Sequence, residues 1–368
     1  MGCGVSSEKL SASREADTDG LDGTRTGKPL PWDSRSKDVS NSEHSSRRAT
    51  SRAPSGADIA SFQTPEDVIV GGFVDSDAAG AVMERLGEGA FCAVFACAFK
   101  GLPAVLKVPL KTCNDRGAAD RDLRREMKVL SKTSTHPGIV KVFGVGTHDK
   151  PFVLLERLEQ GNLATMLGTN KFEMENFRTM MNRKKVEKLH SIVARLSYGK
   201  QLAEALAHLH EHAIPGGVCL HRDVKPSNVG MGKDGTIRLF DLGLARIIHE
   251  HPLGEPYQLT GETGSRRYMA PEVALCQRYC EKVDLYSFGL ILWEMLSLRR
   301  PFEGLPTHMH ETNVIKKGQR PPVNNRLWPP GVAELLTNCW HADPAKRISA
   351  AEAAGRLQAI LDRMPVAK

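Results

Sequence analysis

Apolar residues become frequent and regularly spaced near residue 81 of the 368-residue chain. Residues 6–56 are rich in Ser, Asp, Arg, Thr and Gly, and their few apolar residues follow no period. Such a segment cannot bury enough apolar surface to offset the entropy that is lost on ordering. We therefore predict a disordered tail over residues 1–60, a transition over residues 57–80, and a folded domain from Ala81 onward.

Four short runs rich in Val, Phe, Leu, Ile and Ala predict the strands of a small antiparallel sheet. The runs are 93–99, 102–108, 139–145 and 152–155. Between the second and third runs, Leu123, Met127 and Leu130 recur at helical spacing, which predicts one helix over residues 120–131. A His-Pro-Gly sequence after residue 135 then stops that helix.

Beyond Gly161 the pattern is mostly helical, with apolar stripes at α-helical spacing. The striped segments are 191–212, 283–297, 332–341 and 349–361. One predicted strand, 236–240, interrupts them. A small sheet-rich lobe with one helix, followed by a larger helical lobe, makes an α+β fold, and a chain of this length can bury a sizeable core in two lobes.

The composition excludes several other classes of protein. Hydrophobic residues make up 40% of the chain and charged residues 25%, as in ordinary globular proteins. No apolar run approaches the roughly 20 residues of a membrane span, and the N-terminus lacks the apolar core of a secretory signal. The eight cysteines include no C-x-x-C pair, so we expect reduced thiols in the cytosol rather than a zinc site or disulfide framework.

The net charge of +7 is concentrated in one segment, since the first sixty residues carry balanced charges. Residues 171–200 contain much of the excess, including Arg178, Arg183, Lys184, Lys185 and Lys188. A solvated loop and helix surface explains this segment; a docking site for acidic partners or anionic lipid is the alternative. No nucleic-acid partner is predicted, and the sequence leaves the oligomeric state open.

A glycine-rich hairpin begins the folded domain. It runs through Leu86, Gly87, Glu88, Gly89 and on to Val94. Glycines there let the backbone approach phosphates, although a plain β-turn would explain the hairpin equally well. The last glycine of a G-x-G-x-x-G pattern is replaced at the loop tip by Cys92.

Lys107 closes the apolar strand that follows the hairpin. Its ammonium group would reach the α- and β-phosphates of a nucleotide, held there by the carboxylate of Glu126 on the predicted helix. The alternative is an ordinary solvated strand end.

The sequence His-Arg-Asp-Val-Lys-Pro-Ser-Asn, residues 221–228, is the most specific motif in the chain. Asp223 would orient a substrate hydroxyl or accept its proton, and Lys225 would neutralise charge on the transferred phosphoryl group. Asn228 and Asp241, the latter in an Asp-Leu-Gly turn, would supply oxygen ligands to Mg²⁺, or alternatively to Mn²⁺. Taken singly, these sequences would also suit a polar loop and a common turn.

Together these motifs resemble the protein kinase superfamily over residues 81–362. Residues 268–272 resemble the end of the activation segment in that family, and residues 285–296 and 339–347 resemble the tyrosine-kinase-like group of Ser/Thr kinases. The resemblance implies a bilobal kinase fold that binds ATP and acts on protein substrates. It also implies that Glu272 pairs with Arg347, and that Asp284 caps the backbone near His221.

The resemblance further implies an adenine pocket lined by Leu86, Val94 and Ala104. Leu155 would precede a hinge whose backbone groups bind the adenine edge, namely those of Glu156, Arg157 and Leu158. Gly230 stands where the family usually has a leucine at the floor of the pocket, which predicts looser packing of adenine.

The position of Lys225 and a hydroxyl at Ser265 favour Ser/Thr specificity. The alternatives are a dual-specificity kinase, a pseudokinase scaffold or a non-enzymatic membrane adaptor. Arg222 beside Asp223 predicts a switch in which the arginine pairs with a phosphate on the activation segment. The candidate phosphorylation sites are Thr263, the first choice, and then Thr260 and Ser265.

The sequence Met-Gly-Cys-Gly-Val-Ser at the N-terminus matches the pattern for N-myristoylation at Gly2. Cys3 resembles a palmitoylation site, and a second acyl chain matters because one myristoyl chain binds membranes only marginally. We therefore predict a cytoplasmic protein held at a membrane by its tail. An ordinary flexible N-terminus is the alternative.

Overall fold

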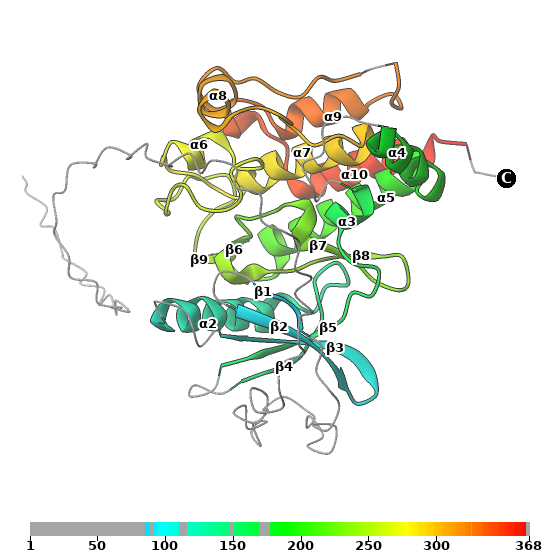
Figure 1. The fold of residues 1–368 in the computed structure, drawn as a ribbon. Coiled ribbons are helices and arrows are strands. Elements are labelled where there is room, and N and C mark those ends of the chain that lie inside the picture. Colours follow the sequence, from blue (N-terminus) through cyan, green and yellow to red (C-terminus); the bar gives the residue numbers. More distant parts are fainter. Residues whose placement is uncertain are drawn as a thin grey trace, which may run out of the picture. The chain divides into compact units, whose positions relative to one another are not determined.

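The computed structural model describes residues 85–88, 92–109, 116–146, 151–168, 177–324 and 326–365. All of them belong to one compact unit, Ser61–Lys368 (Figure 1). The predicted tail, its two acylation residues and Gly89 lie outside the described residues.

The predicted antiparallel sheet is present, with five strands in the order β1-β2-β3-β5-β4. Its strands are β1 (Arg85–Glu88), β2 (Cys92–Phe99), β3 (Leu102–Pro109), β4 (Val142–Val145) and β5 (Val153–Glu156). One helix, α2 (Arg116–Thr133), accompanies the sheet, and its buried side includes Leu123, Leu130 and the carboxylate of Glu126 (Figure 1).

The predicted strand 139–145 is wrong at its beginning. Ile139 forms a parallel bridge with Leu239, and the Val140 N–H donates to the Leu239 carbonyl at 3.0 Å. These residues therefore hydrogen-bond to the larger lobe, so that β4 starts only at Val142. Because the Leu239 N–H also donates to the Gly138 carbonyl at 2.8 Å, the connection between α2 and β4 is anchored at the strand that leads to Asp241.

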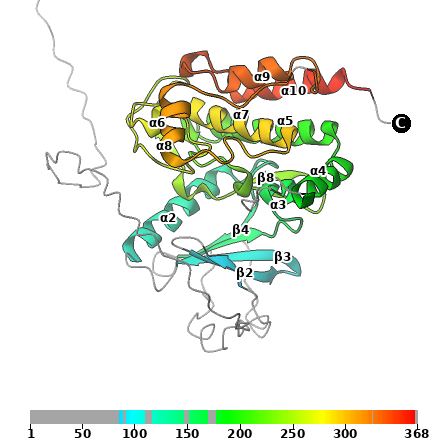
Figure 2. The ribbon, with the colours of Figure 1, turned by 45° about the horizontal axis from the view of Figure 1, so that its top comes forward.

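The larger lobe is mainly helical, as predicted. Its helices are α3 (Leu163–Leu167), α4 (Phe177–Leu189), α5 (Ile192–Ala207), α6 (Pro271–Ala274), α7 (Lys282–Ser297), α8 (Thr307–Met309), α9 (Val332–Cys339) and α10 (Ala350–Asp362). The helix α7 is buried from Val283 to Leu296, beside α5 and α9, and α10 packs along α5 (Figure 2). A Cβ on Gly199 of α5 would lie 2.9 Å from Leu292 Cδ1, so glycine lets α5 and α7 approach.

The larger lobe also contains two small antiparallel pairs of strands, most of which the sequence analysis did not predict. They are β6 (Gly217–Leu220) with β9 (Arg246–His249), and β7 (Val229–Met231) with β8 (Ile237–Leu239). Only β8 matches a predicted strand. The pairs hold the segments that carry Asp223, Asn228 and Asp241 between them. Across the described ranges, no helix is both long and apolar enough to cross a bilayer.

Candidate active site

Lys107, Glu126 and Asp241 converge from β3, α2 and the turn after β8. The Lys107 Nζ atom lies 2.6 Å from Glu126 Oε2 and 2.9 Å from Asp241 Oδ1. The predicted pairing of Lys107 with Glu126 is thus confirmed, and residues 134 positions apart in the chain meet at one ammonium group.

The two carboxylates of this triad stabilise the ammonium of Lys107. Burial alone lowers the pKa of Lys107, but the carboxylates of Glu126 and Asp241 outweigh burial and raise that pKa. Burial also raises the pKa of Glu126. For Asp241 the effect of burial is outweighed by Lys107, which lowers the pKa of the carboxyl group. The ammonium is therefore firmly charged, as a group that binds phosphate must be.

Two residues of the site have left-handed backbone conformations that non-glycine residues rarely adopt. Arg222 has a φ of 68° and Asp241 a φ of 65°. Such conformations persist only where the surrounding contacts fix them, and they cluster at functional sites. In Asp241 the conformation aims the carboxylate toward Lys107.

Asp223 is the centre of a second group of polar contacts. Its Oδ2 atom accepts hydrogen bonds from Lys225 Nζ at 2.7 Å and from Asn228 Nδ2 at 3.2 Å. Its Oδ1 atom accepts from the Ser265 N–H at 2.8 Å, and Lys225 Nζ also donates to Ser265 Oγ at 2.9 Å. These contacts bring together four of the predicted site residues, namely Asp223, Lys225, Asn228 and Ser265.

Asn228 is held in place through its amide nitrogen. Its amide nitrogen donates to the Asp223 carbonyl at 2.9 Å as well as to the carboxylate. The amide oxygen therefore remains for another partner, and with Asp241 it forms a pair of hard oxygen donors suited to a divalent cation. No group of three or more His, Cys, Asp or Glu side chains within the described part of the chain is arranged to hold a metal. A cation here would complete its ligand set with phosphate oxygens and water.

Asp284 fixes the backbone of the loop that carries Asp223. Its two carboxylate oxygens accept the N–H groups of His221 at 2.8 Å and Arg222 at 2.9 Å, which confirms the predicted cap. A third contact was not predicted, because His210 Nε2 lies 3.0 Å from Asp284 Oδ2. Burial raises the pKa of Asp284, but its hydrogen bond to His210 and the other contacts outweigh burial and lower it.

Arg222 holds the activation segment through neutral groups. Its guanidinium donates to the Leu244 carbonyl, to Thr260 Oγ1 at 3.1 Å and to the Tyr279 hydroxyl at 2.9 Å. Thr263 Oγ1 lies 3.1 Å from Thr260 Oγ1, so Thr260 is the candidate that contacts Arg222 directly. The role of Tyr279 had no sequence signal, because this tyrosine follows the activation segment in an otherwise ordinary polar stretch.

The predicted pair of Glu272 and Arg347 is confirmed and lies in the core of the larger lobe. The Arg347 guanidinium binds both carboxylate oxygens, at 2.6 Å and 2.9 Å. Arg347 also donates to the carbonyl groups of His341 and Lys282 and covers the ring of Tyr286. This contact ties the end of the activation segment to the segment before α10.

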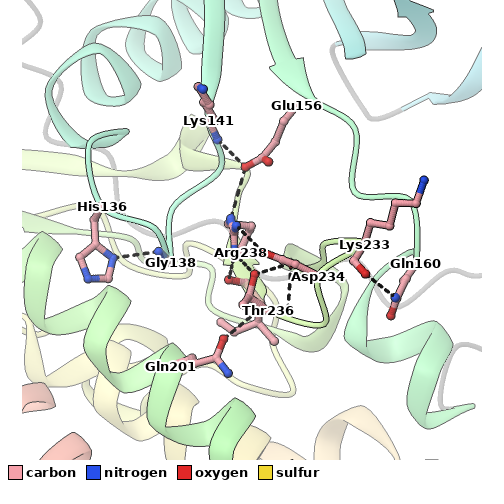
Figure 3. A network of polar contacts seen from close by, with 11 residues as sticks. His136, Gly138, Lys141, Glu156, Gln160, Gln201, Lys233, Asp234, Thr236 and Arg238 are labelled. Carbon is pink, nitrogen blue, oxygen red and sulfur yellow. Dashed lines mark hydrogen bonds and ion pairs between the residues drawn. The ribbon is translucent and has the colours of Figure 1, made fainter. Parts of the chain in front are cut away.

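Two of the three predicted hinge residues use their backbone N–H groups within the protein. The Glu156 N–H donates to the Lys141 carbonyl, and the Arg157 N–H donates to the Pro103 carbonyl. Of the three, only the Leu158 N–H forms no hydrogen bond within the described ranges. The Glu156 carboxylate in turn accepts the Lys141 N–H at 2.8 Å and pairs with Arg238 at 3.4 Å (Figure 3). This link from hinge to β8 was missed, because Arg238 matches no motif.

The pocket walls named from the sequence are apolar but differ in exposure, and Val94 is half-buried. Ala104 and Leu155 are buried, whereas Leu86 is exposed. Cys92 is not at a loop tip as expected. It is the first residue of β2, and burial raises the pKa of its thiol to about 11, so it is a neutral part of the core.

Leu158 occupies the space that a side chain at residue 230 would fill. A Cβ on Gly230 would lie 2.1 Å from Leu158 Cδ1 and 3.2 Å from Leu158 Cβ. The hinge leucine and the glycine are therefore complementary, because Leu158 fills the position of a Cβ on residue 230.

A Gly230→Leu variant is expected to bind ATP about tenfold more weakly, because overpacking costs roughly 1–3 kcal/mol and Leu158 must move with the hinge. Calorimetric titration with ATP measures the change. Adding Leu158→Ala to Gly230→Leu should restore most of the affinity. An unchanged affinity in the single variant would contradict the contact.

Comparisons with known proteins agree with this geometry. A family model described as protein tyrosine and serine/threonine kinase matches residues 81–357. The chain is 32% identical over 283 residues to the protein named serine/threonine-protein kinase VIK of Arabidopsis thaliana, with 76% of this chain and 60% of the relative covered. It is 31% identical to mitogen-activated protein kinase kinase kinase 7 of Drosophila melanogaster, with 63% of this chain and 31% of the relative covered. The chain therefore spans less than two thirds of the length of these relatives.

Proposed function

The chain belongs to the protein tyrosine and serine/threonine kinase family, and from this premise we propose that it transfers the γ-phosphoryl group of ATP to serine and threonine hydroxyls of proteins. The names of its relatives support the choice of serine and threonine over tyrosine. The convergence of Lys107 with Glu126 and Asp241, next to the contacts of Asp223, is the observation that carries the proposal.

Each polar side chain has a distinct part in the transfer. Lys107 binds the α- and β-phosphates, and Glu126 holds its ammonium in place. Asp223 orients the acceptor hydroxyl and takes its proton as the oxygen attacks the γ-phosphorus. Lys225, which contacts both Asp223 and Ser265, faces the charge that moves onto the transferred group.

We propose that Asn228 and Asp241 bind Mg²⁺, with Mn²⁺ as a substitute. Their two oxygens suit a hard cation that keeps phosphate and water ligands. When bound, the cation neutralises negative charge on the β- and γ-phosphates. The hydrogen bond from Asn228 Nδ2 to Asp223 then ties the cation site to the acceptor site.

The test is transfer from γ-labelled ATP to a mixture of Ser, Thr and Tyr peptides by the purified full-length protein. Label on Ser or Thr alone supports the proposal, and label on Tyr as well would make the protein a dual-specificity kinase. ATP binding without transfer under any divalent cation would favour the pseudokinase. Omitting Mg²⁺ and then adding Mn²⁺ separates the two metals.

Phosphorylation of the activation segment is a second part of the proposal, with Thr263, Thr260 and Ser265 as its sites. A phosphate on Thr260 would meet the Arg222 guanidinium, which already contacts the Thr260 hydroxyl. Thr263 is one hydrogen bond further away. Mass spectrometry of active protein should find phosphate between Asp241 and Glu272, and an unmodified segment in fully active protein would reject the switch.

We further propose that acyl chains on Gly2 and Cys3 hold the protein at the cytoplasmic face of a membrane. A Gly2→Ala variant removes the myristoylation site. Its membrane-bound fraction is expected to fall severalfold in cell fractionation, because stable anchoring needs two acyl chains and the variant lacks the myristoyl chain. The Gly4→Ala variant, which keeps the motif residue at position 2, is the matched control. A Gly2→Ala protein that stays in the membrane fraction would reject acylation.

A further inference from the structure

Two arginines follow directly after the residue that contacts the acceptor site. Ser265 bonds to Asp223 through its N–H and to Lys225 through its hydroxyl, so a substrate hydroxyl at Asp223 lies against this part of the chain. The next residues are Arg266 and Arg267. Both arginines therefore belong to the segment that would lie along a bound substrate peptide.

The two arginines differ in how firmly they are held. Arg267 donates to the Pro301 carbonyl and is partly buried. Burial, followed by repulsion from Arg300, lowers the pKa of Arg267. Arg266 is 49% exposed, and its Nη2 atom lies 3.5 Å from a carboxylate oxygen of Glu311, which is 48% exposed. Exposed ion pairs contribute little to stability, so Arg266 can exchange this partner easily.

The local charge is positive even with Glu311 included. Glu311 is shared between Arg266 and Lys316, whose Nζ atom lies 2.9 Å from its other oxygen. Arg267 and Arg300 add two further cations. The carboxylates of Glu294 and Glu303 also act on Arg267, so these four cations face three carboxylates and a small positive excess remains.

The pKa of a buried histidine, His310, is affected by the same two arginines. His310 is 6% exposed, and within the described residues neither of its ring nitrogens has a hydrogen-bond partner. Burial lowers its pKa to about 4, with Arg266 and Arg267 contributing in the same direction. A neutral imidazole there adds no positive charge to this region.

We propose that this kinase selects substrates with an anionic side chain within about two residues of the acceptor serine or threonine, and that Arg266 is the residue that binds it. The inference rests on the proposed kinase function. Asp, Glu and phosphoserine share the required chemistry. Arg266 releases Glu311 to bind the substrate anion, while Arg267 and Arg300 keep the site positive.

The experiment compares rates of phosphorylation for a peptide set in which each position flanking one Ser acceptor is Glu, phosphoserine, Ala or Lys. The wild-type full-length protein is expected to show a kcat/KM about tenfold higher for Glu than for Ala at one or two positions, and lower for Lys, as complementary and like charges require. The phosphoserine peptides show whether a prior phosphorylation is the stronger signal.

Variants test whether Arg266 causes the preference for an anionic side chain. Arg266→Gln should abolish the preference, Arg266→Glu should reverse it toward Lys, and Glu311→Gln should strengthen it by removing the competing carboxylate. Arg278→Gln is the matched control, since Arg278 is another exposed arginine nearby that donates to the Pro256 carbonyl. Ratios between peptides within one preparation do not depend on the fraction of folded protein.

The outcomes separate this inference from the proposed function. If no peptide is phosphorylated, the proposed kinase function fails. If peptides are phosphorylated with equal kcat/KM for Glu and Ala, or if Arg266→Glu keeps the wild-type preference, the inference is overturned and the kinase function stands. A preference that weakens as salt is raised, and follows the charge at residue 266, supports the inference.

Discussion

An Asp223→Asn variant is expected to lose phosphoryl transfer by about 10²- to 10⁴-fold in kcat, the usual contribution of a positioned acid or base. The amide cannot accept the proton of the acceptor hydroxyl. It would also turn an N–H₂ group toward either Lys225 Nζ or the Ser265 N–H, both of which are donors bound to Asp223. Initial rates of transfer from labelled ATP to a Ser peptide measure the loss.

The same variant should bind ATP nearly as well as the wild-type protein, because Lys107, Glu126 and Asp241 are untouched. A Lys107→Met variant is the contrasting control. It removes the ammonium that separates two carboxylates, so both ATP affinity and transfer should fall. Equal transfer rates in Asp223→Asn and wild-type protein would show that the acceptor is activated by another group.

An Arg347→Met variant is expected to lose about 3–5 kcal/mol of unfolding free energy, the usual effect of removing one partner of a buried ion pair. Arg347 is 2% exposed and Glu272 6% exposed, so the remaining carboxylate would have no access to water as compensation. The carbonyl groups of His341 and Lys282 would also lose their donor. Urea unfolding followed by fluorescence measures the change.

Two further variants separate charge from geometry at this pair. Arg347→Lys keeps the positive charge but cannot bind both carboxylate oxygens, so it should remain destabilised. The double variant Glu272→Gln, Arg347→Met removes both charges and should be more stable than Arg347→Met alone. If Arg347→Met unfolded at the same urea concentration as the wild-type protein, the pair would have no part in holding the larger lobe together.

Several features of the fold and the site could be predicted because their signals are local. Strand and helix patterns depend on the spacing of apolar residues, which is visible within a dozen positions. The motifs around Lys107, Asp223 and Asp241 are recognisable in the same way, since each lies within a few residues of chain. The helix that follows Lys107 offered Glu126 as its partner, and the resemblance to the kinase superfamily implied the pairing of Glu272 with Arg347.

Other features depend on residues that are distant in the chain and carry no motif. Ile139 and Val140 look like part of a strand, but their hydrogen-bonding groups are used by Leu239 instead. Leu158 and Gly230 each look unremarkable in the sequence, and only the structure shows that Leu158 Cδ1 fills the place where a Cβ on residue 230 would lie. The contacts of Arg238 with Glu156 and of Tyr279 with Arg222 are of the same kind.

The amino-acid sequence alone was thus sufficient for the chemistry of this protein: which side chains carry charge, which can accept a proton, and in what order they occur. Folding was needed to establish which of those groups have partners already, because a hydrogen bond or a steric contact depends on separations of a few tenths of an ångström between distant segments. Arg266 shows both sides, since its charge is evident in the chain but its place beside the acceptor site follows from the bonds of Ser265 to Asp223 and Lys225.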